Sequence, residues 1–132
     1  MNKRLDIRNE RGQTMVEFVL VLPVLMVVLF GIIQFGLAFN NYVALTDSVR
    51  AGARTAAVSA QTSDPVGITA TRVKTASGDL NSADVNVTVD APSGWVHGND
   101  VVVTATYPYS ISLFGVVVAS GNLSSKTTER IE

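Results

Sequence analysis

An almost unbroken apolar run from Met15 to Phe39 constrains this chain more than any other feature, because Glu17 and Gln34 are its clearly polar residues. About 25 helical residues extend roughly 37 Å, whereas the hydrocarbon core of a bilayer is about 30 Å thick. The apolar region of a cleaved secretory signal is shorter, about 7–15 residues, although Gly36-Leu37-Ala38 imitates such a cleavage site. The run therefore predicts one transmembrane helix over residues 13–39.

The basic residues around this run predict its orientation. Lys3, Arg4, Arg8 and Arg11 precede it, and the next basic residue is Arg50. Positive charge favours the cytoplasmic side of a membrane. We therefore expect a single-pass protein of the cytoplasmic (inner) membrane, with the N-terminus inside and residues 40–132 outside.

The junction between the basic leader and the apolar run carries a recognisable motif. The leader ends in Arg11-Gly12, and Glu17 is the fifth residue after Gly12. This arrangement resembles the class III signal of type IV pilins and pseudopilins. Together with the block Ala51-Gly52-Ala53-Arg54-Thr55-Ala56-Ala57, it resembles the TadE-like minor pilins of tight-adherence (Flp-type) pili. The likeness covers about residues 11–60.

The resemblance implies a processing site and a role for the acidic residue. A prepilin peptidase would cut between Gly12 and Gln13, which removes residues 1–12 and leaves a new α-amine that is normally positive near pH 7. In the pilin family the acid equivalent to Glu17 meets the amine of a neighbouring subunit. Two charges that compensate each other in apolar surroundings would fix the axial register, since a shifted neighbour leaves both unpaired. The alternative is an uncleaved signal anchor with Glu17 at the headgroup level.

The helix is expected to continue beyond the membrane over residues 40–60. Small and apolar residues recur there at steps of three and four, which indicates one buried face: Leu45, Val49, Gly52, Ala53, Ala56 and Ala57. Gly52, Ala53 and Arg54 are the candidate helix-packing residues. The expected partner of this face is the chain's own sheet, and the alternative is the helix of a neighbouring pilin.

Residues 61–132 predict a small distal domain. Asp64 followed by Pro65 indicates the start of a short second helix that Gly78 closes. Alternating apolar residues predict three strands, which are Asp84–Asp90, Asp100–Tyr107 and Leu123–Ile131. Pro108 is expected to end the second strand, and the polar third strand suits a sheet edge.

The apolar segment Tyr109–Ala119 is too short to cross a membrane. It could cover the sheet, touch the outer membrane surface or contact a partner, and burial against the long helix is the expected arrangement. The predicted fold class is therefore α+β: a long N-terminal transmembrane helix that continues into a small domain with a short helix and about three antiparallel strands. This lollipop shape is also what the pilin resemblance implies.

The residue inventory argues against an enzyme. The chain has no cysteine, its single histidine, His97, lies in a glycine-rich turn, and its net charge of −1 gives no basic surface for nucleic acid. We predict no catalytic residues, no metal site, no cofactor and no small-molecule substrate. A calcium site among the aspartates near the strand ends (Asp84, Asp90 and Asp100) and a membrane-anchored enzyme remain alternatives.

The sequence thus predicts a minor pilin or pseudopilin that takes part in assembly, initiation or tip formation of a surface pilus, and so supports adhesion and biofilm formation. The partners that the resemblance implies are a prepilin peptidase, other pilins, the pilus assembly machinery and membrane lipid. The alternative is an uncleaved single-pass protein that presents a small binding domain.

Overall fold

The computed structural model describes residues 10–132. Its elements are α1 (Glu10–Val58), α2 (Pro65–Ala76), β1 (Asn86–Asp90), β2 (Asp100–Leu113) and β3 (Val116–Arg130). The three strands form one antiparallel sheet in the order β1-β2-β3. This confirms the predicted α+β fold class. Most of the predicted leader, including Lys3, Arg4 and Arg8, lies outside the described residues.

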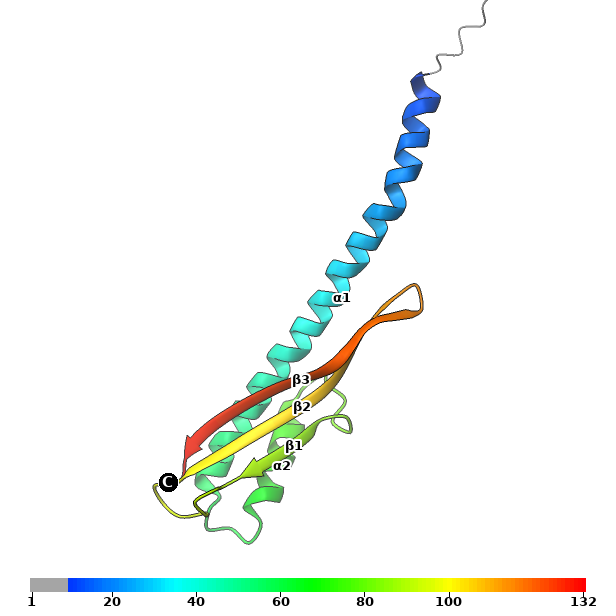
Figure 1. Ribbon diagram of the computed structural model, residues 1–132. Coiled ribbons are helices and arrows are strands. Elements are labelled where there is room, and N and C mark those ends of the chain that lie inside the picture. The colour runs from blue at the N-terminus through cyan, green and yellow to red at the C-terminus, as the bar shows by residue number, and fades with distance from the viewer. Residues whose placement is uncertain (1–9) are drawn as a thin grey trace, which may run out of the picture.

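α1 is one continuous helix of 49 residues that passes through Pro23. Its C-terminal part packs on the distal domain, whereas its N-terminal part projects away from it (Figure 1). The two parts differ because the sequence differs: the first is apolar on all sides, and the second carries the predicted buried face. The residues of that face, from Leu45 to Ala57, are buried as expected.

α2 begins and ends where its sequence signals predict. Asp64 is the N-cap, and its Oδ1 accepts a hydrogen bond of 2.8 Å from the backbone N–H of Gly67. Pro65 is the first helical residue, where its missing N–H costs nothing. Past the last turn, Gly78 adopts a φ of +60°, a left-handed conformation that glycine accepts without strain.

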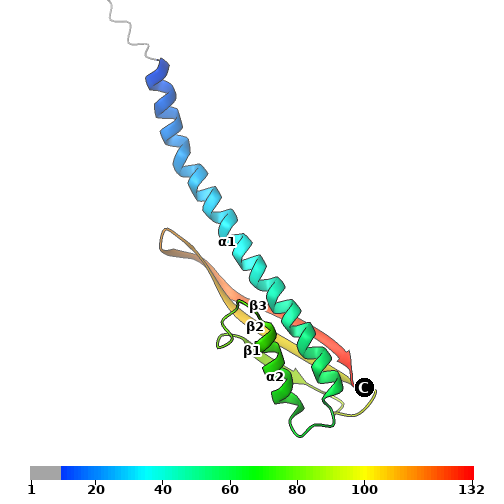
Figure 2. The same cartoon turned by 180° about the vertical axis from the view of Figure 1, so that it is seen from behind.

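The sheet and the two helices form two layers. α1 and α2 lie side by side on one face of the sheet (Figure 2). The core lies between the layers, and its buried residues come from α1, α2, β2 and the segments that flank the elements: Leu45, Val49, Ala53, Ala56, Val73, Leu80, Val85, Val101, Val103, Ala105 and Ile131. Half-buried residues of β1 (Val87 and Val89) and β3 (Leu123) pack against it. The last residue is bonded to the end of α1, since the backbone N–H of Glu132 donates to the carbonyl oxygen of Ala57 at 3.0 Å.

The second and third strands are longer than predicted, whereas β1 is two residues shorter than the predicted Asp84–Asp90. The expectation that Pro108 ends the second strand is wrong. β2 continues through Pro108 to Leu113, and β3 begins at Val116 rather than at Leu123. The pairing of β1 with β2 stops at Thr106, so the later part of β2 has only β3 beside it. A one-sided strand tolerates proline, which a central strand does not.

The expected burial of Tyr109–Ala119 against α1 is wrong for its second half. Tyr109, Ile111 and Leu113 are half-buried, whereas residues 114–119 are exposed. The segment forms the end of a β-hairpin, and its two turn residues are Phe114 (φ 50°) and Gly115 (φ 84°). Two consecutive positive φ values are typical of the tight hairpin turn whose twist matches that of the strands.

Candidate functional site

The predicted cut lies in the first turns of α1. The helix begins at Glu10, so Gly12 and Gln13 are both helical. The first backbone N–H groups of a helix have no partner within it, and helix ends open at little free-energy cost.

Glu17 lies one turn beyond Gln13 on the same side of α1. Gln13 Nε2 donates a hydrogen bond to Glu17 Oε1 at 3.2 Å, and both side chains are exposed. Side chains of a helix lean toward its N-terminus, so the Glu17 carboxylate is directed back along the helix toward the predicted cut. The structure thus brings Gln13 and Glu17 together, with Gly12 adjacent in the chain.

The projecting part of α1 has no protein partner over most of its surface. Every residue from Gln13 to Phe30 is exposed. Between Gly12 and Val58 the helix contains an 18-residue window with a mean hydropathy of 2.9, and none of that window is buried. By length and composition this helix could span a membrane.

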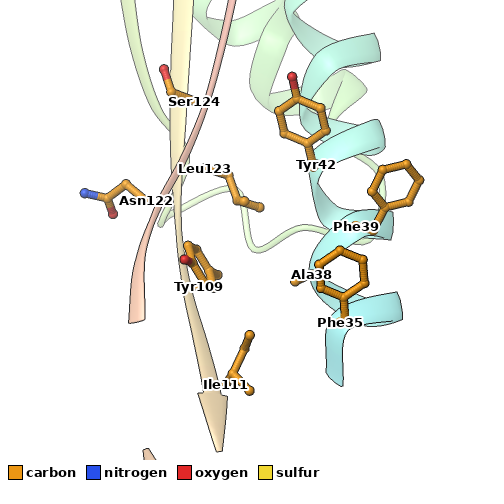
Figure 3. A pocket seen from close by; sticks show the side chains of 9 residues that line it. All are labelled: Phe35, Ala38, Phe39, Tyr42, Tyr109, Ile111, Asn122, Leu123 and Ser124. Carbon is orange, nitrogen blue, oxygen red and sulfur yellow. The ribbon is translucent and has the colours of Figure 1, made fainter. Parts of the chain in front are cut away.

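A hollow of about 400 Å³ lies between α1 and the hairpin formed by the ends of β2 and β3. Figure 3 shows Tyr42 and Ala38 of α1 on one side of it and Leu123, Tyr109 and Ile111 of the hairpin on the other. Its lining is mostly apolar and comprises Phe35, Ala38, Phe39, Tyr42, Tyr109, Ile111, Asn122, Leu123 and Ser124. Gln34 and Asn41 line a second, more polar hollow beside it, together with Ser110.

The three candidate packing residues do not share one environment. Gly52 and Ala53 are buried, whereas Arg54 is exposed. A Cβ atom added at Gly52 would collide with Cγ2 of Val73, so a glycine here allows α1 and α2 to approach closely. Within this chain, Gly52 therefore packs against α2, and Ala53 belongs to the shared core.

The polar residues of the distal domain are dispersed. His97 is exposed in its turn. Asp84 accepts a bond of 2.7 Å from Asn81 Nδ2, and Asp100 lies 3.9 Å from Arg130. Among residues 10–132, no three histidine, cysteine, aspartate or glutamate side chains are grouped so that they could hold a metal ion.

Sequence reasoning missed one contact that links the two parts of the molecule. The rings of Phe30 and Phe114 meet edge to face, with centroids 5.5 Å apart and planes at 67°. Phe114 also borders a hollow lined by Leu22, Pro23, Met26 and Val27 of α1. The only local signal was an aromatic residue followed by Gly115 within an apolar run.

Comparison with known protein families finds one similarity, which covers most of α1. Residues 12–54 match the family model described as TadE-like protein. The matched range starts at the predicted cut and ends at Arg54, so it covers all six candidate residues and confirms the predicted resemblance. Neither the curated proteins nor the solved structures contain a match to this chain.

Proposed function

We propose that this chain is a minor pilin or pseudopilin of a tight-adherence pilus. In this proposal α1 crosses the cytoplasmic membrane once, with residues 40–132 outside. A prepilin peptidase removes residues 1–12, and the processed chain takes part in assembly, initiation or tip formation of the pilus. Adhesion and biofilm formation are the expected consequences of that pilus.

One observation carries the proposal: Glu17 stands one turn from Gln13, within the range that matches the TadE-like family. An acid placed just inside an apolar helix of membrane length needs a compensating partner. The cut supplies one, since it converts the backbone nitrogen of Gln13 into a positively charged amine. In the assembled pilus this partner is the amine of a neighbouring subunit.

The exposed surface of α1 supports the same role. Residues 13–30 are all exposed, so no other part of the chain covers them. Lipid would cover this surface before assembly, and the helices of other pilins would cover it afterwards. The proposed role is therefore structural, and the chain serves a peptidase as substrate rather than acting as an enzyme.

The proposal is tested by the N-terminus of the protein in cells that make an active prepilin peptidase. Mass spectrometry of the purified full chain should find that it starts at Gln13. Cells without the peptidase, and a Gly12→Leu variant in normal cells, should retain residues 1–12. A chain that starts at Met1 in peptidase-positive cells would instead support the uncleaved signal anchor.

Location and role need their own measurement. The cleaved form should co-purify with filaments sheared from the cell surface. A fusion of alkaline phosphatase to the C-terminus should be active, because the fused phosphatase would lie outside the cytoplasmic membrane. The enzymatic alternative would gain support if replacing a distal acid such as Asp84 or Asp100 abolished an activity while assembly stayed normal.

A further inference from the structure

The hairpin arm, defined as residues 107–123, extends beyond the rest of the sheet. β1 pairs with β2 no further than Thr106, and from there the two remaining strands continue alone. The arm runs back along α1 toward the N-terminus, as both views of the molecule show (Figures 1 and 2). It therefore returns toward the part of α1 that is long and apolar enough to span a membrane.

The side chains of the arm change character along its length. Near its base the strands alternate: Tyr109 and Ile111 face α1 across the hollow of Figure 3, while Ser110 lies between them in sequence. Ser110 is exposed and borders the more polar hollow, so apolar and polar side chains alternate along this part of the arm, as is typical of a sheet with one face in water. Ser112 and Ser120 are the last polar side chains before the turn.

Beyond those serines the alternation stops. The tip, defined as residues 113–119, has the apolar sequence Leu-Phe-Gly-Val-Val-Val-Ala, and Ser112 is the polar residue that pairs with its Val117. Phe114 is 74% exposed and Val117 is 59% exposed. A contiguous apolar surface of this kind on a water-soluble domain marks an interaction site. In the register of the hairpin, Ser120 pairs with Ser110, and Ser112 pairs with Val117. The pattern indicates that the surroundings of the arm become apolar beyond the Ser110–Ser120 pair, with Ser112 as the one polar side chain past it.

Phe114 lies beside residues 22–30 of α1, because its ring contacts Phe30 and it borders the hollow lined by Leu22, Pro23, Met26 and Val27. A hydrocarbon layer of about 30 Å that starts at Glu17 ends near Leu37, at 1.5 Å per helical residue. Phe30 then lies roughly 10 Å inside its outer boundary. Since the rings of Phe30 and Phe114 are in contact, any placement of α1 that buries Phe30 in lipid brings Phe114 to at least that depth.

The length of the tip agrees with this depth. Beyond the Ser110–Ser120 pair, β2 continues for three residues, Ile111, Ser112 and Leu113. At about 3.3 Å each these extend roughly 10 Å, which is also the depth that interfacial apolar elements reach in a bilayer. A longer immersion is unfavourable, because the outer edges of a two-stranded hairpin carry unpaired N–H and C=O groups that hydrocarbon cannot satisfy. The Ser110–Ser120 pair therefore stands where the tolerable immersion ends.

We propose that the tip inserts into the outer leaflet of the bilayer that α1 crosses, as a second membrane contact whose ligand is lipid acyl chains. The inference rests on the membrane-spanning placement in the proposed function. Together with α1, the inserted tip holds the distal domain at a fixed height and tilt above the membrane. Extraction of the subunit into a pilus then requires the tip to leave the lipid.

The absence of cysteine from the sequence allows a direct test. The full chain is prepared as three single-cysteine variants at exposed positions: Val117→Cys in the tip, Ile32→Cys on α1 and Lys126→Cys on β3. Each variant carries a polarity-sensitive fluorophore on its cysteine and is reconstituted in phosphatidylethanolamine–phosphatidylglycerol vesicles. The vesicles are prepared with or without lipids that are spin-labelled near the glycerol backbone and quench the fluorophore. Circular dichroism checks that all three variants fold alike.

We expect the spin-labelled lipids to quench the Val117 label about as strongly as the Ile32 label, and about threefold more than the Lys126 label, because quenching requires contact at acyl-chain depth. Quenching at Ile32 with the Val117 label as weakly quenched as the Lys126 label would overturn the insertion and leave the membrane span intact. Loss of quenching at Ile32 as well would overturn both proposals.

The competing occupant of the tip is a second copy of this chain. Oxidation of the Val117→Cys variant in vesicles of increasing lipid-to-protein ratio distinguishes it from lipid. Disulfide-linked dimers that persist on dilution, with no quenching of the tip label, would assign the tip to a protein contact and overturn the lipid proposal. Lipid quenching without dimers is the expected result.

Discussion

Gln13 Nε2 and Glu17 Oε1 are joined by a hydrogen bond of 3.2 Å on the exposed surface of the first turns of α1. The two residues stand four apart, which is the spacing at which helical side chains are neighbours. Before the cut, the neutral Gln13 amide is thus a partner for the carboxylate. After the proposed cut, the same residue would also carry a positive α-amine. The proposed processing would therefore change the charge beside Glu17.

The first prediction concerns this carboxylate. A Glu17→Gln variant keeps the size and hydrogen-bonding capacity of the side chain and removes its charge. We expect normal membrane insertion and normal cleavage after Gly12. Incorporation into sheared filaments should fall at least about tenfold, because one member of a charge pair in apolar surroundings is left uncompensated. Immunoblots of the membrane and filament fractions measure the ratio.

Gln34→Leu is the matched control for Glu17→Gln, since it removes the other clearly polar residue of the apolar run. Gln34 lies on the side of α1 that faces the hairpin arm, so its loss leaves the processing segment unchanged. We expect its incorporation to stay near normal. Normal incorporation of the Glu17→Gln variant would show that this acid does not set the register.

The fold was predictable wherever local chemistry determines structure. Asp64 and Pro65 specify the start of α2, and the regular spacing of Leu45 and Val49 specifies the buried face of α1. Short-range rules of this kind need no knowledge of what packs opposite. The long helix was predictable for the same reason, because its length and apolar character are properties of the segment alone.

The hairpin arm could not be predicted, because its determinants are not local. Pro108 normally ends a strand, and it is tolerated here only because β1 has already stopped at Thr106. The turn uses Phe114-Gly115 in place of the Asn-Gly pair that signals a tight hairpin. In the candidate site, the sequence indicated Gly12, Gln13 and Glu17 through a motif, whereas the Phe30–Phe114 contact joins residues far apart in sequence.

The second prediction tests the start of α2. An Asp64→Ala variant removes the side-chain acceptor of the Gly67 N–H and should lower the free energy of unfolding by about 1 kcal/mol. Thermal unfolding of the full chain in detergent micelles, followed by circular dichroism, measures this loss. Asp79→Ala removes an exposed carboxylate outside the helices and should change stability little. Equal losses in both variants would contradict the capping role.

The third prediction is a substitution that raises the free energy of unfolding. Thr69 Oγ1 is buried at the face where α2 meets α1 and has no hydrogen-bond partner among the described residues. A Thr69→Val variant keeps the branched shape and removes the hydroxyl. It should therefore raise the free energy of unfolding by about 1 kcal/mol, since an unsatisfied buried polar group is eliminated. Chemical denaturation of the full chain in micelles provides the measurement.

Thr71→Val is a control for the same chemistry at an exposed position of α2. Its stability should stay within about 0.5 kcal/mol of the natural chain, as is usual for surface substitutions. A Thr69→Val variant that is less stable than the natural chain would show that the hydroxyl has a stabilising partner in solution.

The fourth prediction concerns the close approach of α1 and α2. A Gly52→Ala variant gains up to about 1 kcal/mol in helix propensity. It also places a methyl group against Cγ2 of Val73, a stiff branched side chain that is fully buried. Overpacking of a core costs about 1–3 kcal/mol, so the collision outweighs the gain. We expect net destabilisation in thermal unfolding of the full chain.

The sign of this substitution should reverse once Val73 is truncated. In a Val73→Ala background the colliding Cγ2 is gone, and the Thr69 carbonyl oxygen, at 3.6 Å from the added Cβ, is in ordinary contact. Adding Gly52→Ala to Val73→Ala should therefore stabilise the chain by up to about 1 kcal/mol, because only the propensity term remains. The coupling between the two sites is the difference between the two effects of Gly52→Ala. An equal effect of Gly52→Ala in both backgrounds would mean that Val73 does not limit the approach, and that Gly52 serves a contact outside this chain.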